Sequence, residues 1–143
     1  MKILVLGGCA DMAVPLLSIL KADTDVERVT LADINDAKAC QRASELGGKF
    51  QGARCDANDH DSVVGVMRGH AVCISYVGPF YVFETKMARC AIEAGIPYVS
   101  IADDYDAYLE VIKLDDAARD AGVKILTGFG NSPGITQILA RKG

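Results

Sequence analysis

The sequence predicts an α/β fold built on a six-stranded parallel sheet that is doubly wound, with helices on both faces. Three observations support this prediction: apolar runs of strand length recur along the 143 residues, segments with helical spacing lie between them, and glycines end most of those segments. Strands that are apolar throughout require helices on both faces. Right-handed crossovers then narrow the strand order to 3-2-1-4-5-6.

Six apolar runs predict the strands. They lie at residues 3–6, 29–32, 50–55, 71–74, 98–101 and 123–126, and the run at 50–55 is the weakest. The segments between them are long enough for the helical crossovers that join parallel strands.

Five segments with helical spacing predict the helices, at residues 12–20, 36–46, 61–67, 83–94 and 105–121. The inward positions expected in three of them are Val14, Leu17 and Leu20, then Ala39, Ala43 and Leu46, and finally Leu109, Val111 and Ile112. The glycines that end helical segments are Gly47, Gly48, Gly69, Gly95 and Gly122.

Composition argues against several classes of protein. The net charge of −4 and the pI near 5.1 leave no basic stripe for a phosphate backbone, so nucleic acid is not an expected partner. The five cysteines are odd in number and show no C-x-x-C spacing, which predicts free thiols in a reducing compartment. Because neither a signal peptide nor an apolar run of about 18 residues is found, we expect a cytoplasmic protein without a membrane partner.

Residues 1–13 predict a buried strand, a glycine turn and the opening of a helix, which is where the phosphates of a nucleotide usually bind. In the spacing G-x-G-x-x-G/A the turn offers Gly8, Ala10 and Ala13, and in the looser spacing G-x-x-G-x-x-G it offers Gly7, Ala10 and Ala13. Either register places an alanine where a phosphate-facing glycine is expected. The residues expected to contact the phosphates are Gly7, Gly8, Cys9, Ala10, Asp11 and Met12.

Asp33 ends the second predicted strand. A carboxylate at this place accepts hydrogen bonds from both hydroxyls of an adenosine ribose and repels a 2′-phosphate, which favours NAD over NADP. Its neighbours Ile34 and Asn35 belong to the same expected site and supply no arginine for a 2′-phosphate, while Lys38 and Arg42 lie in the following helix. The alternative is that Asp33 caps that helix.

Two further loops are expected to contact the dinucleotide. The loop after the fourth strand lies across the point where the strand order reverses, and its candidates for the nicotinamide half are Tyr76, Val77, Gly78, Pro79 and Phe80. After the third strand, Asp56 and Ala57 are candidates for the adenine edge. An ordinary strand-to-helix turn explains the first loop equally well, and Asp59 as a helix cap explains the second.

Other polar residues offer weaker candidates. Asp103 and Asp104 follow the fifth strand, where they either orient a substrate amine or begin the helix at Tyr105. His60 and His70 have no partners at metal-ligand spacing, so no metal site is expected.

The pattern G-x-S-x-G at residues 130–134 fits the nucleophile elbow of hydrolases. Pro133 cannot donate the backbone N–H that the oxyanion hole needs, and no histidine follows Ser132. We therefore do not expect a serine hydrolase. Ser132 as a cap and Pro133 as the first helical residue instead predict the start of another helix.

Five segments together resemble the saccharopine dehydrogenase family, which includes the carboxynorspermidine dehydrogenases. They are residues 3–13, 31–33, 77–80, 94–100 and 130–134, of which the Gly-Pro-Phe loop and the final Ser-Pro-Gly are the more specific. The resemblance implies a Rossmann NAD(P)-binding domain at residues 1–130, with residues 131–143 starting the connection to a C-terminal domain that binds substrate and forms a homodimer.

By the same resemblance, the whole enzyme would be an oxidoreductase acting on the C–N bond of a secondary amine derived from amino acids. Its protein part would hold the reacting carbon against the nicotinamide and exclude water. Ser100 stands where family members often have aspartate, so it is a candidate for a position near the substrate. The 143 residues by themselves are expected to be inactive.

Two alternatives stay open at this point. One is a non-catalytic regulatory module that binds a nucleotide, because such modules share the glycine turn and the acid after the second strand. The other is a degenerate domain retained for assembly, with its cofactor site lost.

Overall fold

The protein, seen in a computed structural model that describes residues 1–142, contains one sheet of six parallel strands in the order β3-β2-β1-β4-β5-β6. The strands are β1 (Lys2–Leu6), β2 (Arg28–Asp33), β3 (Phe50–Arg54), β4 (Val72–Ser75), β5 (Tyr98–Ser100) and β6 (Ile125–Leu126). The helices are α1 (Val14–Ala22), α2 (Asp36–Leu46), α3 (His60–Met67), α4 (Phe80–Ala94), α5 (Tyr105–Ile112), α6 (Asp115–Asp120) and α7 (Ile135–Lys142). The predicted fold class and strand order are confirmed.

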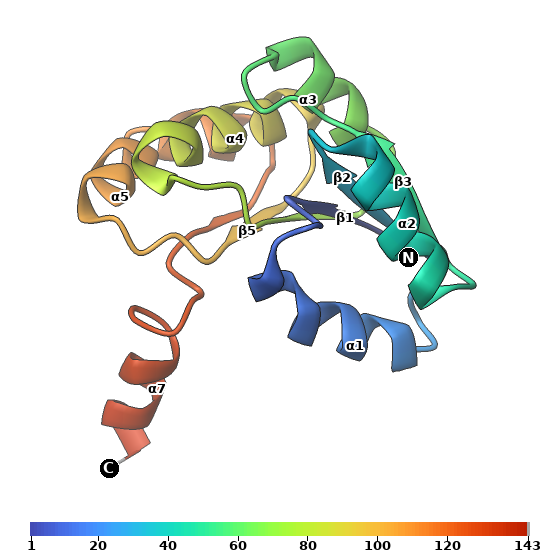
Figure 1. Cartoon of the computed structure of the whole chain (residues 1–143). Coiled ribbons are helices and arrows are strands. Elements are labelled where there is room, and N and C mark those ends of the chain that lie inside the picture. The colour runs from blue at the N-terminus through green and yellow to red at the C-terminus, as the bar shows by residue number, and fades with distance from the viewer. Residues whose placement is uncertain (143) are drawn as a thin grey trace.

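The central strand β1 is apolar on both faces, and this places helices on both sides of the sheet. Successive side chains of a strand point to opposite faces. Ile3 and Val5 pack in one core with residues of α1 and α2, whereas Leu4 and Leu6 pack in the other with residues of α3 and α4. Figure 1 accordingly shows α1 on the side of the sheet opposite α3 and α4.

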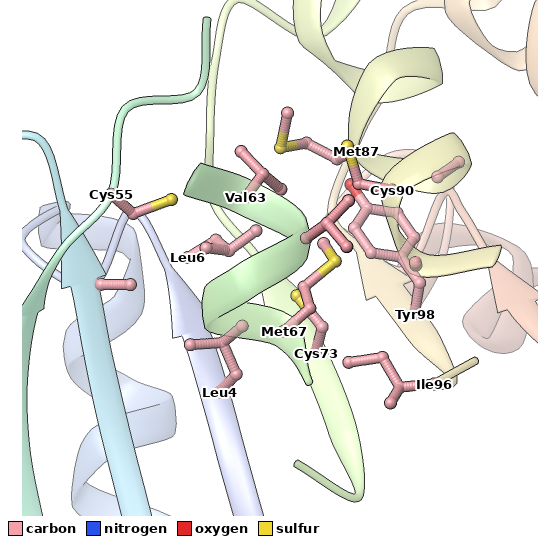
Figure 2. Close-up of a cluster of buried hydrophobic side chains, with 14 of the residues drawn as sticks. Leu4, Leu6, Cys55, Val63, Met67, Cys73, Met87, Cys90, Ile96 and Tyr98 are labelled. Atoms are coloured by element: carbon pink, nitrogen blue, oxygen red, sulfur yellow. The ribbon is translucent and has the colours of Figure 1, made fainter. Parts of the chain in front are cut away.

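The core between the sheet, α3 and α4 contains half of the largest fully buried side chains (Figure 2). Met67 of α3 and Met87 of α4 pack in the same core as Leu4 and Tyr98 from the strands, and each of these four side chains is almost fully buried. Burying a side chain of this size contributes about 1.5–3 kcal/mol. This core fixes α4 against the sheet, and α4 in turn borders the cavity described below.

Short connections fix where the strands end. Beyond β1, a 3₁₀ turn at Asp11–Ala13 leads into α1. Asn35 begins α2 by accepting a hydrogen bond from the Lys38 amide at 3.0 Å, and Asp59 begins α3 by accepting one from the Ser62 amide at 3.1 Å. Within residues 1–142, no helix is both long and apolar enough to cross a bilayer.

The single helix predicted over residues 105–121 is wrong, because the chain forms α5 and α6 with a break at residues 113–114. The break lets Leu114 enter the core beside Val111. Leu109 and Ile112, expected to face inward, are 40% and 50% exposed. Val14 is exposed as well, so only Leu17 and Leu20 of the first predicted stripe are buried.

The last helix begins later than predicted. Its expected start at Ser132 and Pro133 is wrong, since α7 begins at Ile135. The preceding residues form a turn that the Ile135 amide closes by donating to the Gly130 carbonyl at 3.1 Å. The Gln137 side chain accepts the Gly134 amide, which caps the helix in place of Ser132.

Helix α2 lies so close to β3 that Gly52 has no room for a side chain. A Cβ at this position would lie 2.5 Å from the backbone nitrogen of Cys40. Because a backbone atom cannot swing away, we expect Gly52→Ala to lower the free energy of unfolding by about 1–3 kcal/mol. Urea denaturation followed by circular dichroism measures this value.

Gly65 is the matched control, because a Cβ there would meet no atom within 4 Å and the residue lies inside α3. Gly65→Ala is expected to raise the free energy of unfolding by up to about 1 kcal/mol, the helix preference of alanine over glycine. Equal effects of the two substitutions would contradict the close approach of α2 to β3.

The buried thiol of Cys90 should make the folded chain less stable at alkaline pH. Burial raises the pKa of its thiol to about 11 from an ordinary 9.0, and the Glu93 carboxylate adds to the rise. Between these values the unfolded chain releases the proton and the folded chain keeps it, so the free energy of unfolding falls as pH rises. We expect Cys90→Ala to reduce this slope by up to about 1.4 kcal/mol per pH unit.

Urea unfolding at pH 8, 9, 10 and 11 gives the slope. Cys40→Ala, which removes an exposed thiol, should change the slope less than Cys90→Ala. Parallel pH profiles for the wild-type chain and Cys90→Ala would contradict the assignment to Cys90.

Candidate functional site

The glycine turn, residues 7–10, leaves β1 between the ends of β2 and β4. Gly7 adopts φ +67°, and a Cβ there would lie 3.1 Å from the Tyr76 carbonyl carbon beyond β4. At Gly8 a Cβ would lie 2.9 Å from Cβ of Leu31 in β2. The Gly7 amide donates to the Ala32 carbonyl at 2.8 Å. Both glycines are therefore required by the close approach of neighbouring chain segments.

The two alanines of the motif are compatible with the backbone. Ala10 adopts φ −68° and ψ 143°, an ordinary conformation for a residue with a side chain. Ala13 is fully buried and packs in the same core as Leu17 and Leu31. The turn thus needs no glycine at Ala10 or Ala13 to hold its own conformation.

Asp33 joins the end of β2 to the glycine turn. Its carboxylate accepts the Cys9 amide at 3.1 Å through one oxygen and the Asn35 amide at 3.1 Å through the other. Asn35 rather than Asp33 caps α2, so the capping alternative for Asp33 is wrong. Each carboxylate oxygen retains a second lone pair for a ligand hydroxyl.

A cavity of about 450 Å³ lies at the carboxyl ends of β1, β2, β3 and β4, and we call it the first cavity. Eleven of the residues expected to contact a dinucleotide line it. They are Gly7, Cys9, Ala10, Asp33, Ile34, Asn35, Asp56, Ala57, Tyr76, Val77 and Gly78. The structure thus brings together residues from four separate loops.

Five expected residues lie outside the lining of the first cavity: Gly8, Asp11, Met12, Pro79 and Phe80. Gly8 is buried against Leu31, and the side chains of Asp11 and Met12 are exposed. Phe83 and Met87 of α4, rather than Phe80, supply the apolar wall. Asp56 accepts the Asn58 amide at 2.9 Å, which stabilises the turn after β3.

Cys9 is a packing residue in this turn. Its side chain is buried, and burial together with the nearby Asp33 carboxylate raises the pKa of its thiol. A raised pKa disfavours the reactive thiolate.

A second cavity, of about 600 Å³, lies between the loop after β5 and the segment that leads to α7. Asp103 and Asp104 line it together with Tyr105, Thr127 and Phe129. Helix α5 begins at Tyr105 as predicted, with Asp104 at the N-cap position. The Asp104 side chain makes no cap hydrogen bond there, and its carboxylate instead accepts the Tyr81 amide at 3.0 Å in the first turn of α4. This contact ties the loop after β5 to the loop after β4.

Ser100 lines neither cavity. It is fully buried, and its hydroxyl donates to the carboxylate of Glu84 on α4, which is 1% exposed. The same carboxylate accepts the Tyr98 hydroxyl at 2.9 Å and the Thr127 hydroxyl at 2.8 Å. Any influence of Ser100 on a substrate would therefore pass through this cluster.

Sequence reasoning missed several residues of the site. Phe83 and Met87 are four residues apart on α4, a spacing typical of one helix face, and this signal could have identified them. Lys38 also lines the first cavity. Glu84 had no such signal, because its partners lie 14, 16 and 43 residues away in the chain.

The chain is similar to known proteins both in sequence and in fold. Residues 3–126 match the family described as the saccharopine dehydrogenase NADP binding domain. Among solved structures, apo saccharopine dehydrogenase (L-Glu forming) from Saccharomyces cerevisiae is similar with a TM-score of 0.84 and 26% identity, covering 99% of this chain and 30% of that chain.

Two further structures share the fold. Triphenylmethane reductase from Citrobacter sp., complexed with NADP(H), has a TM-score of 0.66 and 16% identity over 87% of this chain and 48% of that one. A 3-hydroxyacyl-CoA dehydrogenase type-2 from Mycobacterium avium has a TM-score of 0.63 and 20% identity over 88% and 71% of the two chains.

The strand order, the glycine turn and the cavity at the point of strand reversal define a dinucleotide-binding domain of the Rossmann class. Because the family match extends over most of the chain, the chain belongs to the saccharopine dehydrogenase NADP binding domain family. It spans 30% of the length of the yeast enzyme to which it is similar.

Glu84 and the three hydroxyl groups that it accepts, those of Tyr98, Ser100 and Thr127, form what we call the Glu84 cluster. A small substitution in this cluster should have a large effect on stability. Glu84→Gln replaces one acceptor oxygen by an amide donor that faces hydroxyl groups, so we expect the free energy of unfolding to fall by about 1–3 kcal/mol. Glu110→Gln, at an exposed ion pair with Lys113, should change it by less than about 0.5 kcal/mol.

Thr127→Val tests whether the stability lost in Glu84→Gln comes from the hydrogen bonds of the Glu84 cluster or from a general effect on α4. It should cost less stability in the Glu84→Gln background than in the wild-type chain, because the hydrogen bond is already weakened. Additive losses in this double-mutant cycle, measured by urea denaturation, would show that the two side chains do not interact.

Proposed function

We propose that the first cavity binds NAD or NADP and that the chain is the cofactor domain of an oxidoreductase. This oxidoreductase acts on the C–N bond of a secondary amine derived from amino acids, like the family that the chain resembles. One observation carries the proposal: the cavity reaches from the glycine turn past Asp33 to Val77 and Gly78 on the other side of β1. A dinucleotide binds across this point of strand reversal in the Rossmann fold.

The residues present fit the phosphates of a dinucleotide. Gly7 lines the first cavity and has no side chain, so a phosphate can approach the backbone of the turn closely there. A Cβ at Gly7 would also lie 3.1 Å from the Tyr76 carbonyl carbon. Asp11 and Met12 open the 3₁₀ turn, where a helix leaves its first N–H groups without an intrahelical partner. These amides are therefore suited to an anion, although their side chains lie outside the cavity lining.

The adenosine and nicotinamide halves would meet different surfaces. Asp33, Ile34 and Asn35 would hold the ribose, with Asp56 and Ala57 at the adenine edge. Tyr76, Val77 and Gly78 would border the nicotinamide.

When bound, the cofactor would donate or accept a hydride. The residues of this chain would orient it and exclude water, chiefly through the apolar side chains of Val77, Phe83 and Met87.

We propose NAD as the preferred cofactor, although the matched family is described as NADP binding. The Asp33 carboxylate lines the cavity beside the expected ribose and would repel a 2′-phosphate. Within residues 1–142, Lys38 is the one positively charged residue in the lining. A single flexible ammonium beside a carboxylate is a weak site for a phosphate dianion.

The reaction itself would require more than this chain. We propose that residues 131–143 start the connection to a further domain that binds substrate and forms a homodimer, and that the 143 residues alone are inactive. Asp103 and Asp104 would then lie near the substrate, in the second cavity. All five cysteines are free, which supports a reducing, cytoplasmic location. The match to a dehydrogenase family disfavours a regulatory module.

Titration of the chain with NADH and NADPH, followed by nicotinamide fluorescence, tests the proposed cofactor. We expect both to bind, with NADH about tenfold tighter, because the Asp33 carboxylate would repel the 2′-phosphate of NADPH. A tenfold difference corresponds to about 1.4 kcal/mol. Asp33→Asn keeps an acceptor oxygen and removes the charge, so the preference for NADH should fall to about threefold or less.

Asp36→Asn is the control, because Asp36 lies in the first turn of α2 and outside the lining of the first cavity. It should leave the preference unchanged. Absence of binding at millimolar concentrations of both cofactors would overturn the proposal, and a preference of the wild-type chain for NADPH would overturn the role of Asp33.

A further inference from the structure

Arg42 of α2 contacts the glycine turn, and it is not among the residues that line the first cavity. Its Nη1 donates to the Ala10 carbonyl at 3.1 Å and reaches the Gly8 carbonyl at 3.4 Å. Its side chain is 20% exposed. Nη2 lies 3.9 Å from the carboxylate of Asp11, whose side chain is fully exposed, so this ion pair contributes little.

The hydrogen bonds of Arg42 fix the direction of two peptide groups. In a trans peptide the C=O and the following N–H point in opposite directions. Arg42 holds the Gly8 carbonyl while Asp33 accepts the N–H of Cys9, so both ends of this peptide are held by charged side chains of the β2–α2 unit. Its bond to the Ala10 carbonyl likewise turns the Asp11 N–H away from α2.

We propose that Arg42 is a positioning residue for the diphosphate of the dinucleotide. By holding the Ala10 carbonyl toward α2, it directs the Asp11 N–H toward the phosphates. Its contacts with the Gly8 and Ala10 carbonyls also keep these repelling oxygens away from the phosphates. This inference rests on the proposed dinucleotide function and adds a residue outside the lining of the first cavity.

A planar guanidinium is suited to this task. The Gly8 and Ala10 carbonyl oxygens both contact Nη1, whose two N–H bonds are fixed in the plane of the guanidinium. A lysine at residue 42 would keep the charge but offer a compact ammonium without this geometry. The arrangement therefore predicts that charge alone does not replace Arg42.

Binding of NADH, ADP and adenosine to the 143-residue chain tests the proposal, because only the first two ligands carry a diphosphate. We expect Arg42→Met to weaken NADH and ADP about tenfold and to leave adenosine within about twofold. Arg42→Lys should recover less than half of the lost affinity on a logarithmic scale. Arg119→Met, which removes an exposed arginine paired with Asp115 on α6, is the control and should change none of the three.

Amide NMR spectra give a readout that a loss of packing would not produce. On addition of ADP, the Asp11 amide should shift in the wild-type chain and shift by less than half as much in Arg42→Met, while the overall dispersion of the spectrum stays unchanged.

Three outcomes would overturn the positioning role: unchanged ADP affinity in Arg42→Met, an equal loss for adenosine and ADP, or full recovery by Arg42→Lys. Failure of the wild-type chain to bind any dinucleotide would instead overturn the proposed function on which this inference rests.

Discussion

The central strand β1 is buried on both faces, and the positions of the other elements follow from this constraint. Its alternating side chains enter two separate cores, one beneath α1 and α2 and the other beneath α3 and α4. A strand enclosed in this way can leave the sheet only at its end, between β2 and β4. The glycine turn occupies that exit, and the absent side chains of Gly7 and Gly8 are what allow the chain to pass between Tyr76 and Leu31. The first cavity lies directly beyond.

Different elements of the fold hold the two halves of the candidate site in place. The glycine turn and the expected ribose site both depend on the β2–α2 unit, because Asp33 accepts the Cys9 amide and Arg42 donates to the Ala10 carbonyl. The opposite wall depends on α4, which contributes Phe83 and Met87 to the cavity. Glu84 on the same helix accepts hydroxyl groups from β5 and from Thr127, which borders the second cavity. Helix α4 therefore connects the two cavities.

Much of the fold could be predicted because its signals are local. Each strand is an apolar run enclosed by helices. The helical spacing of Ala39 and Ala43 likewise predicts the helix over Asp36–Leu46, which has these bounds in the structure. The break before α6 could not be predicted, since neither glycine nor proline marks it and only the burial of Leu114 explains it. The same holds for Asp104 and Arg42, whose partners lie 23 and 32 residues away and are set by tertiary packing. The expected cofactor contacts remain predictions, although eleven of them share one cavity.

The two-sided burial of β1 also bears on how the sheet finds its alignment. A strand with one apolar face loses its core contacts when it slips by one residue. In β1, Ile3, Leu4, Val5 and Leu6 are all apolar, so a slip against β2 would still present apolar groups to both cores. Alignment must come from contacts that only one register allows, and the glycine turn supplies them: Gly7 donates to the Ala32 carbonyl, and Gly8 alone fits against Leu31. The turn that is suited to phosphate thereby also acts as the stop that sets the sheet in register.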